Sequence, residues 1–365
     1  MIVSELEAEN FRNLKKLSFL PCGQVNIIYG ENAQGKTNLI EAIWLFTGGK
    51  SFRGAKDSEL TAFGEEKCTL GLNFYGAQRE QSAEIKIEKK RMAVLNGIGL
   101  ASAARLAGNF CAVVFSPVHL SLVKDGPQVR RNFLDAAICQ IKPRYAGFLA
   151  DYKRALLQRN ALLKDLQFHS ELYDLLDVWE DRLSRLGAAI LAHRLNYIST
   201  LAPVCAEIYE GLSSSREQFH ISYQASVENM QNTAREGTAQ CLQEAFKHAR
   251  VRDIASGVTS CGPHRDDLVI DINGISARTY GSQGQQRSCV LAMKLGEAAL
   301  LEKSAGEPPV ILLDDVMSEL DSSRQDYVLN HIRGSQVFIT CCEPTPALRG
   351  GGKAFSMSNG ILQPK

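Results

Sequence analysis

The sequence has no long hydrophobic run and no leader-like start. Its longest apolar runs, such as 112–115 and 310–313, have charged residues nearby and are far shorter than the roughly 20 residues that a membrane-spanning helix needs. The first residues, MIVSELEAENFRN, lack the basic segment, apolar core and small-residue end that are typical of a secretory signal. We therefore expect a cytoplasmic protein with no membrane segment.

The chain also lacks an excess of either charge. Lys and Arg number 41 against 40 for Asp and Glu, which gives a formal net charge of +1. A nucleic-acid surface must therefore be a local basic patch. The ten cysteines are irregularly spaced, as free thiols are, and Cys261 with His264 forms only half of a zinc-site pattern. Composition alone thus indicates no metal and no particular partner.

Neither an internal repeat nor a low-complexity tail is present, and 45% of the 365 residues are hydrophobic, enough for a large core. From Pro127 the apolar residues recur at helical spacing, whereas the segments before and after the helical block are strand-like. The pattern predicts an α/β head formed by residues 1–125 and 252–365, with a helical domain, 126–251, inserted into it. The expected strands are 2–11, 25–29, 69–74, 83–87, 111–115, 268–272, 310–313 and 336–340.

Two apolar series lie in the helical segment, before and after a polar turn around His169. In the second series the gaps alternate between four and three residues, through Leu172, Leu176, Trp179, Leu183, Leu186 and Ile190. Such spacing is typical of a coiled-coil seam and allows an antiparallel helical hairpin. Because only a few heptads are sustained, two long helices packed in a compact helical domain are the preferred interpretation.

A phosphate-binding loop follows the expected strand 25–29. The glycines let the backbone turn so that successive N–H groups point inward, with the positive end of a helix behind them. Lys36 supplies a cation for the β and γ phosphates, and the Thr37 hydroxyl is placed to hold Mg²⁺. A chance glycine-rich turn is disfavoured because the flanking strand and helix are in the right order. The loop consists of Gly30, Glu31, Asn32, Ala33, Gln34, Gly35, Lys36 and Thr37.

Two acids end the apolar run 310–313, as expected for a central parallel strand that opens on a ligand crevice. Asp314 is expected to bind Mg²⁺ through water, and Asp315 to orient or deprotonate the attacking water. A pair of solvated turn residues is the alternative. With the phosphate loop upstream, the pair completes one Mg-nucleotide site.

A second anion site is expected at the start of the helix that follows Tyr280. Ser282 and Gly284 lie in the segment SQGQQR, where backbone N–H groups at a helix start favour a phosphate. The chain needs only one such loop for its own nucleotide. We therefore expect this segment to cap the γ-phosphate held by a second subunit, although Ser282 can also cap its own helix.

Eight blocks in a fixed order make the chain resemble the RecF family of ABC and SMC-like ATPases, which implies a P-loop ATPase head of the ABC type. The resemblance spans residues 11–321. It places Arg12 and Asn38 beside the loop as nucleotide-binding residues, and Ser282 and Gly284 as signature residues acting across a dimer. The blocks are FRN at 11–13, GKTN at 35–38, KSFR at 50–53, FSP at 115–117, RRNFLD at 130–135, GPHRDD at 262–267, SQGQQR at 282–287 and DDVMSELD at 314–321.

The resemblance implies an ATP- and Mg²⁺-dependent homodimer that binds DNA at gaps or junctions between single and double strands. With RecO and RecR such a protein helps to place RecA on DNA and supports the SOS response. Turnover is expected to be slow, because Asp315 is one methylene shorter than the Glu of fast ABC ATPases and stands farther from the water.

Three positions depart from the family pattern. Ala33 stands where Gly is usual, which is tolerable if its φ stays negative. His119 stands where an acid is common, and Cys341-Cys342-Glu343 replaces Thr residues and an acid. The γ-phosphate sensor is therefore open. The alternative function, an ATPase subunit of a membrane transporter, is disfavoured because the LSGGQ signature and the switch His are missing, and an SMC protein would carry a far longer coiled-coil insert.

Overall fold

A computed structural model describes residues 1–227, 235–343 and 352–364. The chain forms two compact units, each built from separate stretches of sequence. The first unit contains Met1–Leu120, Cys205–Glu217 and Gln283–Lys365, and the second contains Ser121–Val204 and Gln218–Ser282. Each is described separately below. Among the described residues, no helix is long and apolar enough to cross a bilayer.

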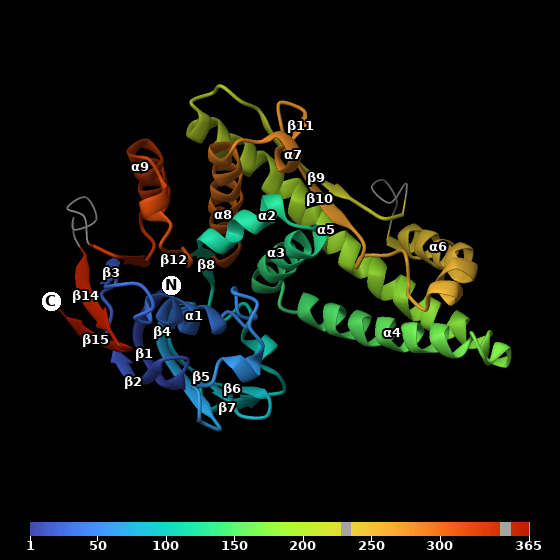
Figure 1. Cartoon of the computed structure of the whole chain (residues 1–365), viewed down its shortest axis with the longest axis horizontal. Helices are drawn as coiled ribbons and strands as arrows, with labels where there is room; N and C mark the ends of the chain where they lie inside the picture. Colours follow the sequence, from blue (N-terminus) through green and yellow to red (C-terminus); the bar gives the residue numbers. More distant parts are fainter. Residues whose placement is uncertain (228–234, 344–351, 365) are drawn as a thin grey trace. The chain divides into compact units, whose positions relative to one another are not determined.

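The core of the first unit is a six-stranded sheet whose strands come from distant parts of the sequence (Figure 1). Five strands are parallel, and only the edge strand β15 runs antiparallel to its neighbour. In the register, Asp314 on β12 lies beside Thr340 on β13, so both residues lie at the carboxyl edge of the sheet. The order is β15 (Ile361–Pro364), β14 (Lys353–Ser358), β3 (Val25–Tyr29), β13 (Val337–Cys341), β12 (Val310–Asp314) and β8 (Ala112–Phe115).

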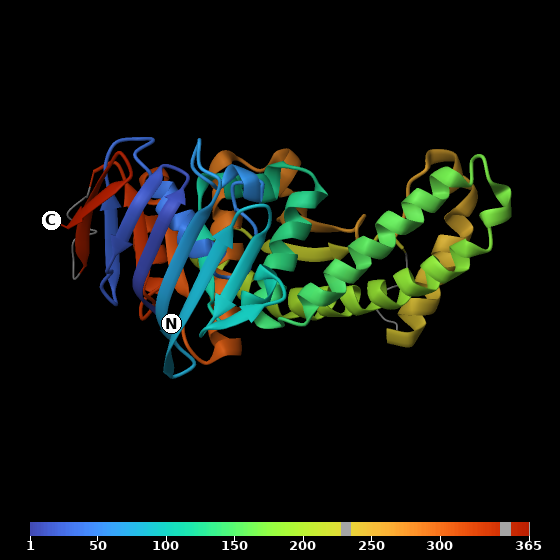
Figure 2. The ribbon, with the colours of Figure 1, turned by 90° about the horizontal axis from the view of Figure 1, so that it is seen from below.

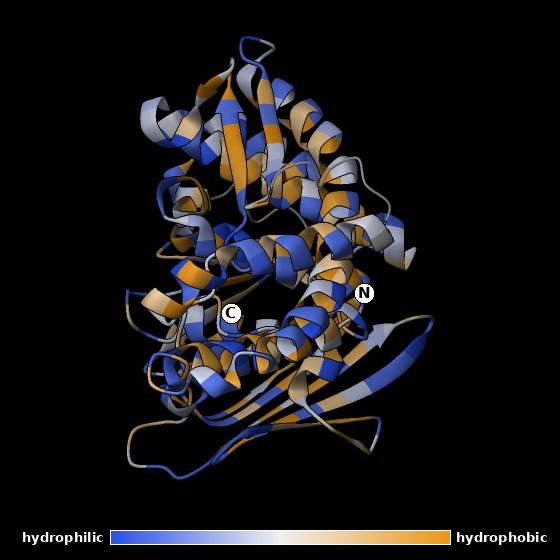
Figure 3. Cartoon of the chain, turned by 90° about the vertical axis from the view of Figure 1, so that its right-hand side faces the viewer, coloured by the Kyte–Doolittle hydropathy of each residue, from blue (hydrophilic) through white to orange (hydrophobic). Residues whose placement is uncertain are grey.

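A second six-stranded sheet of the first unit is antiparallel, and its strands lie side by side in Figure 2. Buried and exposed residues alternate along its strands, which is the period expected for a sheet with one solvated face (Figure 3). The order is β2 (Leu14–Phe19), β1 (Ile2–Phe11), β4 (Cys68–Gly76), β5 (Arg79–Ile87), β6 (Arg91–Leu95) and β7 (Ile98–Leu100).

Helix α1 (Lys36–Leu45) contacts strands of both sheets of the first unit, which explains why eight of its ten residues are buried. Helix α8 (Gln283–Ala305) packs against β8 and against α9 (Ser322–His331). Short 3-10 turns η1 (Asp57–Glu59), η2 (Ala103–Leu106), η3 (Pro117–Leu120) and η6 (Met317–Glu319) connect these elements. The first turns of α1 and α8 therefore belong to firmly packed helices.

The second unit is mainly helical. Helices α4 (Tyr145–Asp165) and α5 (Leu175–Ser213) run antiparallel on either side of η4 (Ser170–Leu172), and α5 continues into the first unit after Val204 (Figure 1). Ile254 of α6 (Arg235–Ser256) packs on the leucines of α4 and α5. The other elements are α2 (Ser121–Lys124), α3 (Pro127–Ile141), α7 (Ala277–Tyr280) and a three-stranded sheet of β9 (Phe219–Gln224), β10 (Asp267–Ile272) and β11 (Ile275–Ser276).

All eight predicted strands are present, but the strand 268–272 (β10) belongs to the second unit and not to the head. The fold class is confirmed. The helical hairpin is present as well, but α6 covers it, as the compact-domain interpretation requires. Strand β9, which pairs with β10, was missed inside the segment predicted to be helical. The second unit runs from Ser121 to Ser282 rather than from 126 to 251, and residues 205–217 within that range belong to the first unit.

Candidate nucleotide-binding site

The loop between β3 and α1 has a backbone that needs glycine at two positions. Gly30 has φ +155°, and a Cβ there would lie 2.3 Å from the Met357 carbonyl oxygen. Gly35 has φ +114°, and a Cβ there would lie 2.7 Å from Oδ1 of Asn13. A side chain at either position would thus clash and strain the backbone. Both glycines shape the loop as predicted from its motif.

Ala33 departs from the expectation for this loop, because its φ is +64° rather than negative. The left-handed region costs a residue with a Cβ roughly 1 kcal/mol or more. The family's usual glycine avoids that cost. Ala33 is therefore held in the left-handed region under strain.

Lys36 is buried, and its ammonium group is held by the loop itself. Its Nζ donates to the carbonyl oxygens of Gly30 at 2.6 Å and Glu31 at 2.9 Å. Both acceptors are neutral, so the positive charge of Lys36 stays uncompensated by these contacts. This places a cation at the centre of the loop, where a phosphate chain is expected.

Asp314 and Thr37 meet at the carboxyl edge of the parallel sheet although 277 positions separate them. The Thr37 hydroxyl donates to Asp314 Oδ1 at 2.8 Å, and the Thr340 and Ser116 hydroxyls donate at 3.0 and 3.2 Å. Burial raises the pKa of Asp314, as does the charge of Asp315, while the hydroxyl donors oppose the rise. A carboxylate and a hydroxyl oxygen are the donor set that Mg²⁺ takes together with phosphate oxygens, so the pair fits that ion.

Thr340 was missed as a site residue. Its hydroxyl donates to Asp314 and accepts from the backbone N–H of Asp315 at 2.9 Å, so it orients both acids. Asp315 has φ +52°, a conformation that Asp tolerates better than most residues. The signal in the sequence was the Thr that precedes Cys341, because parallel strands that end at one edge bring their last residues together.

Arg12 lies in the turn after β1 and is fixed by a buried acid on α1. Its Nε and Nη2 donate to the Glu41 carboxylate at 3.0 and 3.1 Å, and Nη1 donates to the Glu59 carbonyl oxygen. Ser51 also donates to Glu41, which is fully buried. Glu41 was not predicted as a site residue. An acid inside the apolar helix NLIEAIWL was the available signal.

Polar side chains also join the loop to its surroundings. Asn38 donates to Asn13 at 2.8 Å and accepts from Arg53 at 2.9 Å. The side-chain oxygen of Gln34 accepts from the backbone N–H of Asn359 at 2.6 Å. Gln34 therefore ties the loop to the turn between β14 and β15.

These residues border a cavity of about 820 Å³ in the first unit. Of the predicted site residues, Gly30, Glu31, Gln34, Asp314, Ser282 and Gly284 are not among those that line this cavity. The predicted residues that line it are Arg12, Asn32, Ala33, Gly35, Lys36, Thr37, Asn38 and Asp315.

Gly284 belongs to the first turn of α8, and Ser282 directly precedes that helix. The next residues tie α8 to the segment after β12. Arg287 donates to the Glu319 carbonyl oxygen at 3.2 Å and pairs with its carboxylate at 3.3 Å, and Arg324 donates to Ser288. The start of α8 is therefore held to the segment that continues from Asp314 and Asp315.

Comparison with known proteins agrees with this geometry. The model of the RecF/RecN/SMC N terminal domain matches residues 2–348. RecF proteins of Clostridium acetobutylicum and Acetivibrio thermocellus, each described as a DNA replication and repair protein, are 39% and 38% identical to the chain over 99% and 94% of both lengths. The chain belongs to the RecF family. This membership counts against the transporter alternative.

Solved structures extend the likeness to three dimensions. A structure described as the recombination mediator protein RecF-ATP in the RecFOR pathway matches with a TM-score of 0.94 at 37% identity, over 100% of this chain and 97% of that one. The Smc head domain of Pyrococcus furiosus matches with a TM-score of 0.55 at 17% identity, over 100% of this chain and 96% of that one, which supports the fold alone. The chain thus has the ABC-type head that was predicted.

Two departures from the RecF pattern can now be placed. His119 Nδ1 accepts the backbone N–H of Ser116 at 3.1 Å, and burial lowers its pKa well below the usual 6.5, as does the charge of Lys294. A neutral His119 thus supports the residue that donates to Asp314. Cys342 is exposed, and its Sγ lies 3.4 Å from Asn32 Oδ1, next to the loop.

Proposed function

We propose that the chain binds Mg-ATP in the 820 Å³ cavity and hydrolyses it slowly as a switch for DNA binding. The observation that carries the proposal is the meeting of Thr37 and Asp314 at 2.8 Å beside the Lys36 loop. In the sequence these two residues belong to separate motifs, and only the fold brings them together. Further support comes from the relative whose structure is described as RecF-ATP.

In this proposal the loop N–H groups and Lys36 bind the phosphate chain, and Arg12 adds a fixed cation at the cavity wall. Thr37 and Asp314 hold Mg²⁺, which when bound supplies charge compensation for the phosphate oxygens. Asp315 orients the attacking water and accepts its proton, while Thr340 fixes the backbone that carries Asp315. Slow turnover follows from the short reach of the Asp315 side chain.

We further propose that Ser282 and Gly284 act on ATP held by a second copy of the chain. They do not line the cavity of their own chain, although they start a helix that can bind an anion. ATP, but not ADP, should then convert monomers to dimers, because the γ-phosphate adds charge-assisted contacts across the interface.

A mixing assay tests this shared site. Lys36→Met removes the phosphate-binding cation, and Ser282→Arg blocks the signature by bulk, so each variant alone should be inactive. In mixed dimers one site carries both lesions and the other carries none, so activity should partly return. No recovery, together with a monomer at every ATP concentration in sedimentation, would show that the site is complete within one chain.

The proposed cellular role is that of the family: binding of single-strand/double-strand DNA junctions or gaps and, with RecO and RecR, promotion of RecA loading and SOS induction. Support comes from relatives described as DNA replication and repair proteins and from a structure assigned to the RecFOR pathway. Binding to gapped, single-stranded and duplex DNA, each with ATP, ADP and no nucleotide, tests it. Equal binding in all three nucleotide conditions would contradict the switch.

A further inference from the structure

Three arginines of the second unit are held by neutral acceptors on one loop, residues 257–266. Arg265 donates through Nε and Nη2 to the Thr259 carbonyl oxygen at 3.1 and 2.9 Å. Arg252 donates to the Ser260 hydroxyl, and Arg131 donates to the Asp266 carbonyl oxygen. None of the three pairs with a carboxylate within the described part of the chain. These contacts thus leave the charge of each guanidinium group uncompensated, although the nearby Asp267 and Asp266 also act on Arg131.

The acids near these arginines are already engaged. Asp266 accepts from the Tyr223 hydroxyl at 2.6 Å and from the backbone N–H of Ser226 at 2.7 Å. Asp267 accepts two hydrogen bonds from Arg130, and Asp253 pairs with Arg159 at 2.8 Å. The neighbouring carboxylates therefore have other donors, and Arg252 and Arg265 are exposed, whereas Arg131 is half-buried.

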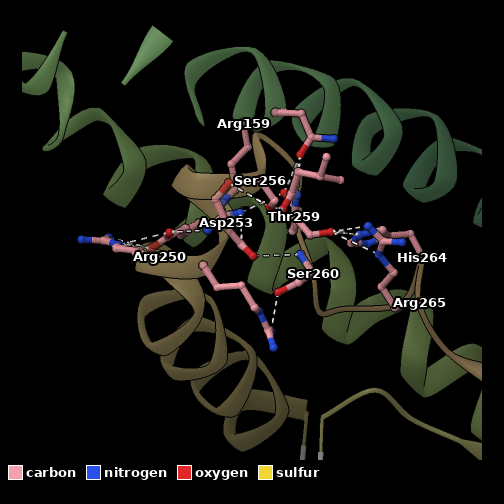
Figure 4. Close-up of polar contacts among 12 residues, drawn as sticks. Arg159, Arg250, Asp253, Ser256, Thr259, Ser260, His264 and Arg265 are labelled. Atoms are coloured by element: carbon pink, nitrogen blue, oxygen red, sulfur yellow. Dashed lines mark hydrogen bonds and ion pairs between the residues drawn. The ribbon is translucent and has the colours of Figure 1, made fainter. Parts of the chain in front are cut away.

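The loop 257–266, which carries the acceptors of these arginines, is fixed by a fully buried ionic network, drawn in Figure 4. Arg159 is 0% exposed, pairs with Glu180 and Asp253, and donates to the Thr259 hydroxyl at 2.8 Å. Thr259 in turn bonds Asn160 through its N–H and its hydroxyl, at 2.9 and 2.7 Å. Thr259 is thus locked by the helices on one side while its carbonyl holds Arg265 on the other (Figure 4).

The acceptors of all three arginines lie on one loop. Thr259, which holds Arg265, and Ser260, which holds Arg252, are consecutive residues, and Asp266, which holds Arg131, directly follows Arg265. Arg252 and Arg265 are exposed, and Arg131 is half-buried. An arginine has five N–H donors, of which Arg265 uses two here and Arg252 one. The remaining donors of these arginines, the arginine strip, are of the kind that binds phosphate bidentately.

We propose that this strip, Arg131, Arg252 and Arg265, is a binding site for the phosphodiester backbone of nucleic acid. The site rests on the proposed DNA-binding function and assigns part of it to the second unit. Because the contacts reach phosphates rather than base edges, binding is independent of sequence. The locked loop lowers the ordering cost that mobile arginines would pay on binding.

The test compares two double variants of the full chain. Arg252→Gln/Arg265→Gln removes two charges of the strip. Arg154→Gln/Arg185→Gln removes two charges from exposed arginines of α4 and α5 that already pair with Asp151 and Asp181. Affinity for a short DNA duplex and for a single strand of equal length is measured by fluorescence anisotropy over a salt series, together with ATP binding and the thermal unfolding midpoint.

For the strip variant we expect weaker binding and a fall of about one in the slope of log affinity against log salt for each arginine removed. The control variant should keep the parental slope, and ATP binding and the unfolding midpoint should stay parental in both. If binding to one DNA form alone falls, that form is the strip's ligand.

The result separates this inference from the proposed function. A parental chain that binds no DNA would refute the function itself. A parental chain that binds DNA while the strip variant keeps its affinity and slope would refute the strip alone. An equal loss of DNA affinity in both variants would show that net charge alone explains the effect, and this too would refute the strip. Loss of binding to poly-glutamate, with DNA binding unchanged, would assign the strip to an acidic protein instead.

Discussion

The arginine of the nucleotide site and the arginines of the loop 257–266 are held in opposite ways. Arg12 donates two hydrogen bonds to Glu41, a buried carboxylate, whereas Arg265 donates two to a backbone carbonyl. The carboxylate fixes Arg12 and cancels much of its charge, so the group acts mainly through its position. The carbonyl fixes Arg265 and leaves its charge intact. Two arginines that are alike in the sequence are thus suited to different ligands.

The largest effect is expected from Lys36→Met, which removes the one cation that the loop holds through neutral acceptors. The variant loses two charge-assisted hydrogen bonds from Lys36 to the phosphates of ATP. At about 1.5 kcal/mol each, their loss should weaken ATP binding by about a hundredfold or more. Isothermal titration calorimetry measures it. Lys16→Met, an exposed lysine of β2, should bind as the parent does. Equal affinity in both variants would refute the role of the loop.

The comparison is tested directly by replacing one arginine of each kind. Arg12→Gln leaves the buried Glu41 without its main partner and should lower the free energy of unfolding by about 3 kcal/mol. Arg265→Gln removes an exposed charge that has no carboxylate partner among the described residues, so its effect should stay within about 0.5 kcal/mol. Urea unfolding of both variants measures the difference. Equal losses of stability would show that pairing with a buried carboxylate does not set Arg12 apart from Arg265.

The loop 257–266 should also lose stability in acid through His264, which bonds the Thr259 carbonyl and the Tyr152 hydroxyl. Burial, the largest cause, and nearby arginines lower its pKa from 6.5 to about 4. Between those values the unfolded chain takes up a proton that the folded chain does not, so stability falls as pH drops through this window, by about 3 kcal/mol.

Urea unfolding of the parent and of His264→Gln, from pH 7 down to about pH 4, tests this dependence. The variant keeps a donor and an acceptor but cannot titrate, so its stability should fall less steeply. His169→Gln changes an exposed histidine and should follow the parental curve. If both variants follow the parent, His264 does not set the acid dependence.

The smallest effect is expected at Ala33. Ala33→Gly relieves the positive φ, worth about 1 kcal/mol, but raises the entropy of the unfolded chain, worth about 0.5 kcal/mol. The free energy of unfolding should therefore rise by about 0.5 kcal/mol, as thermal melts can measure. Ala55→Gly, at a loop residue without positive φ, should instead be destabilising. A loss at both positions would mean that Ala33 is not strained.

The candidate nucleotide-binding site could be predicted from the sequence because its residues lie in contiguous motifs. The run 30–37 and the acids 314 and 315 each carry their chemistry within a few residues. The sequence did not predict Thr340 and Glu41, which the fold brings to the site. Thr340 reaches Asp314 because β13 pairs with β12, and Glu41 of α1 reaches Arg12 in the turn after β1.

The second unit shows the same limit more strongly. Helical periodicity predicted α4 and α5, but β9 is a single short strand whose role depends on pairing with β10 more than 40 residues later. Arg131 and Arg265 lie in the blocks RRNFLD and GPHRDD, but those blocks gave no sign of the contacts that hold them. The anchors of the arginine strip on Thr259, Ser260 and Asp266 arise from the tertiary fold, and sequence spacing carries no trace of which acceptor holds a guanidinium group.

The parallel sheet has a consequence for synthesis on the ribosome. Strand β3 pairs with β13, and Thr37 finds Asp314 only 277 residues later. At roughly 5–20 residues per second, the loop is translated on the order of tens of seconds before its partner strands exist. During that time β3 has neither of its partner strands, β13 and β14, and α1 can contact β1 but not β12 or β13. The nascent chain therefore depends on protection of these segments until nearly its whole length has emerged.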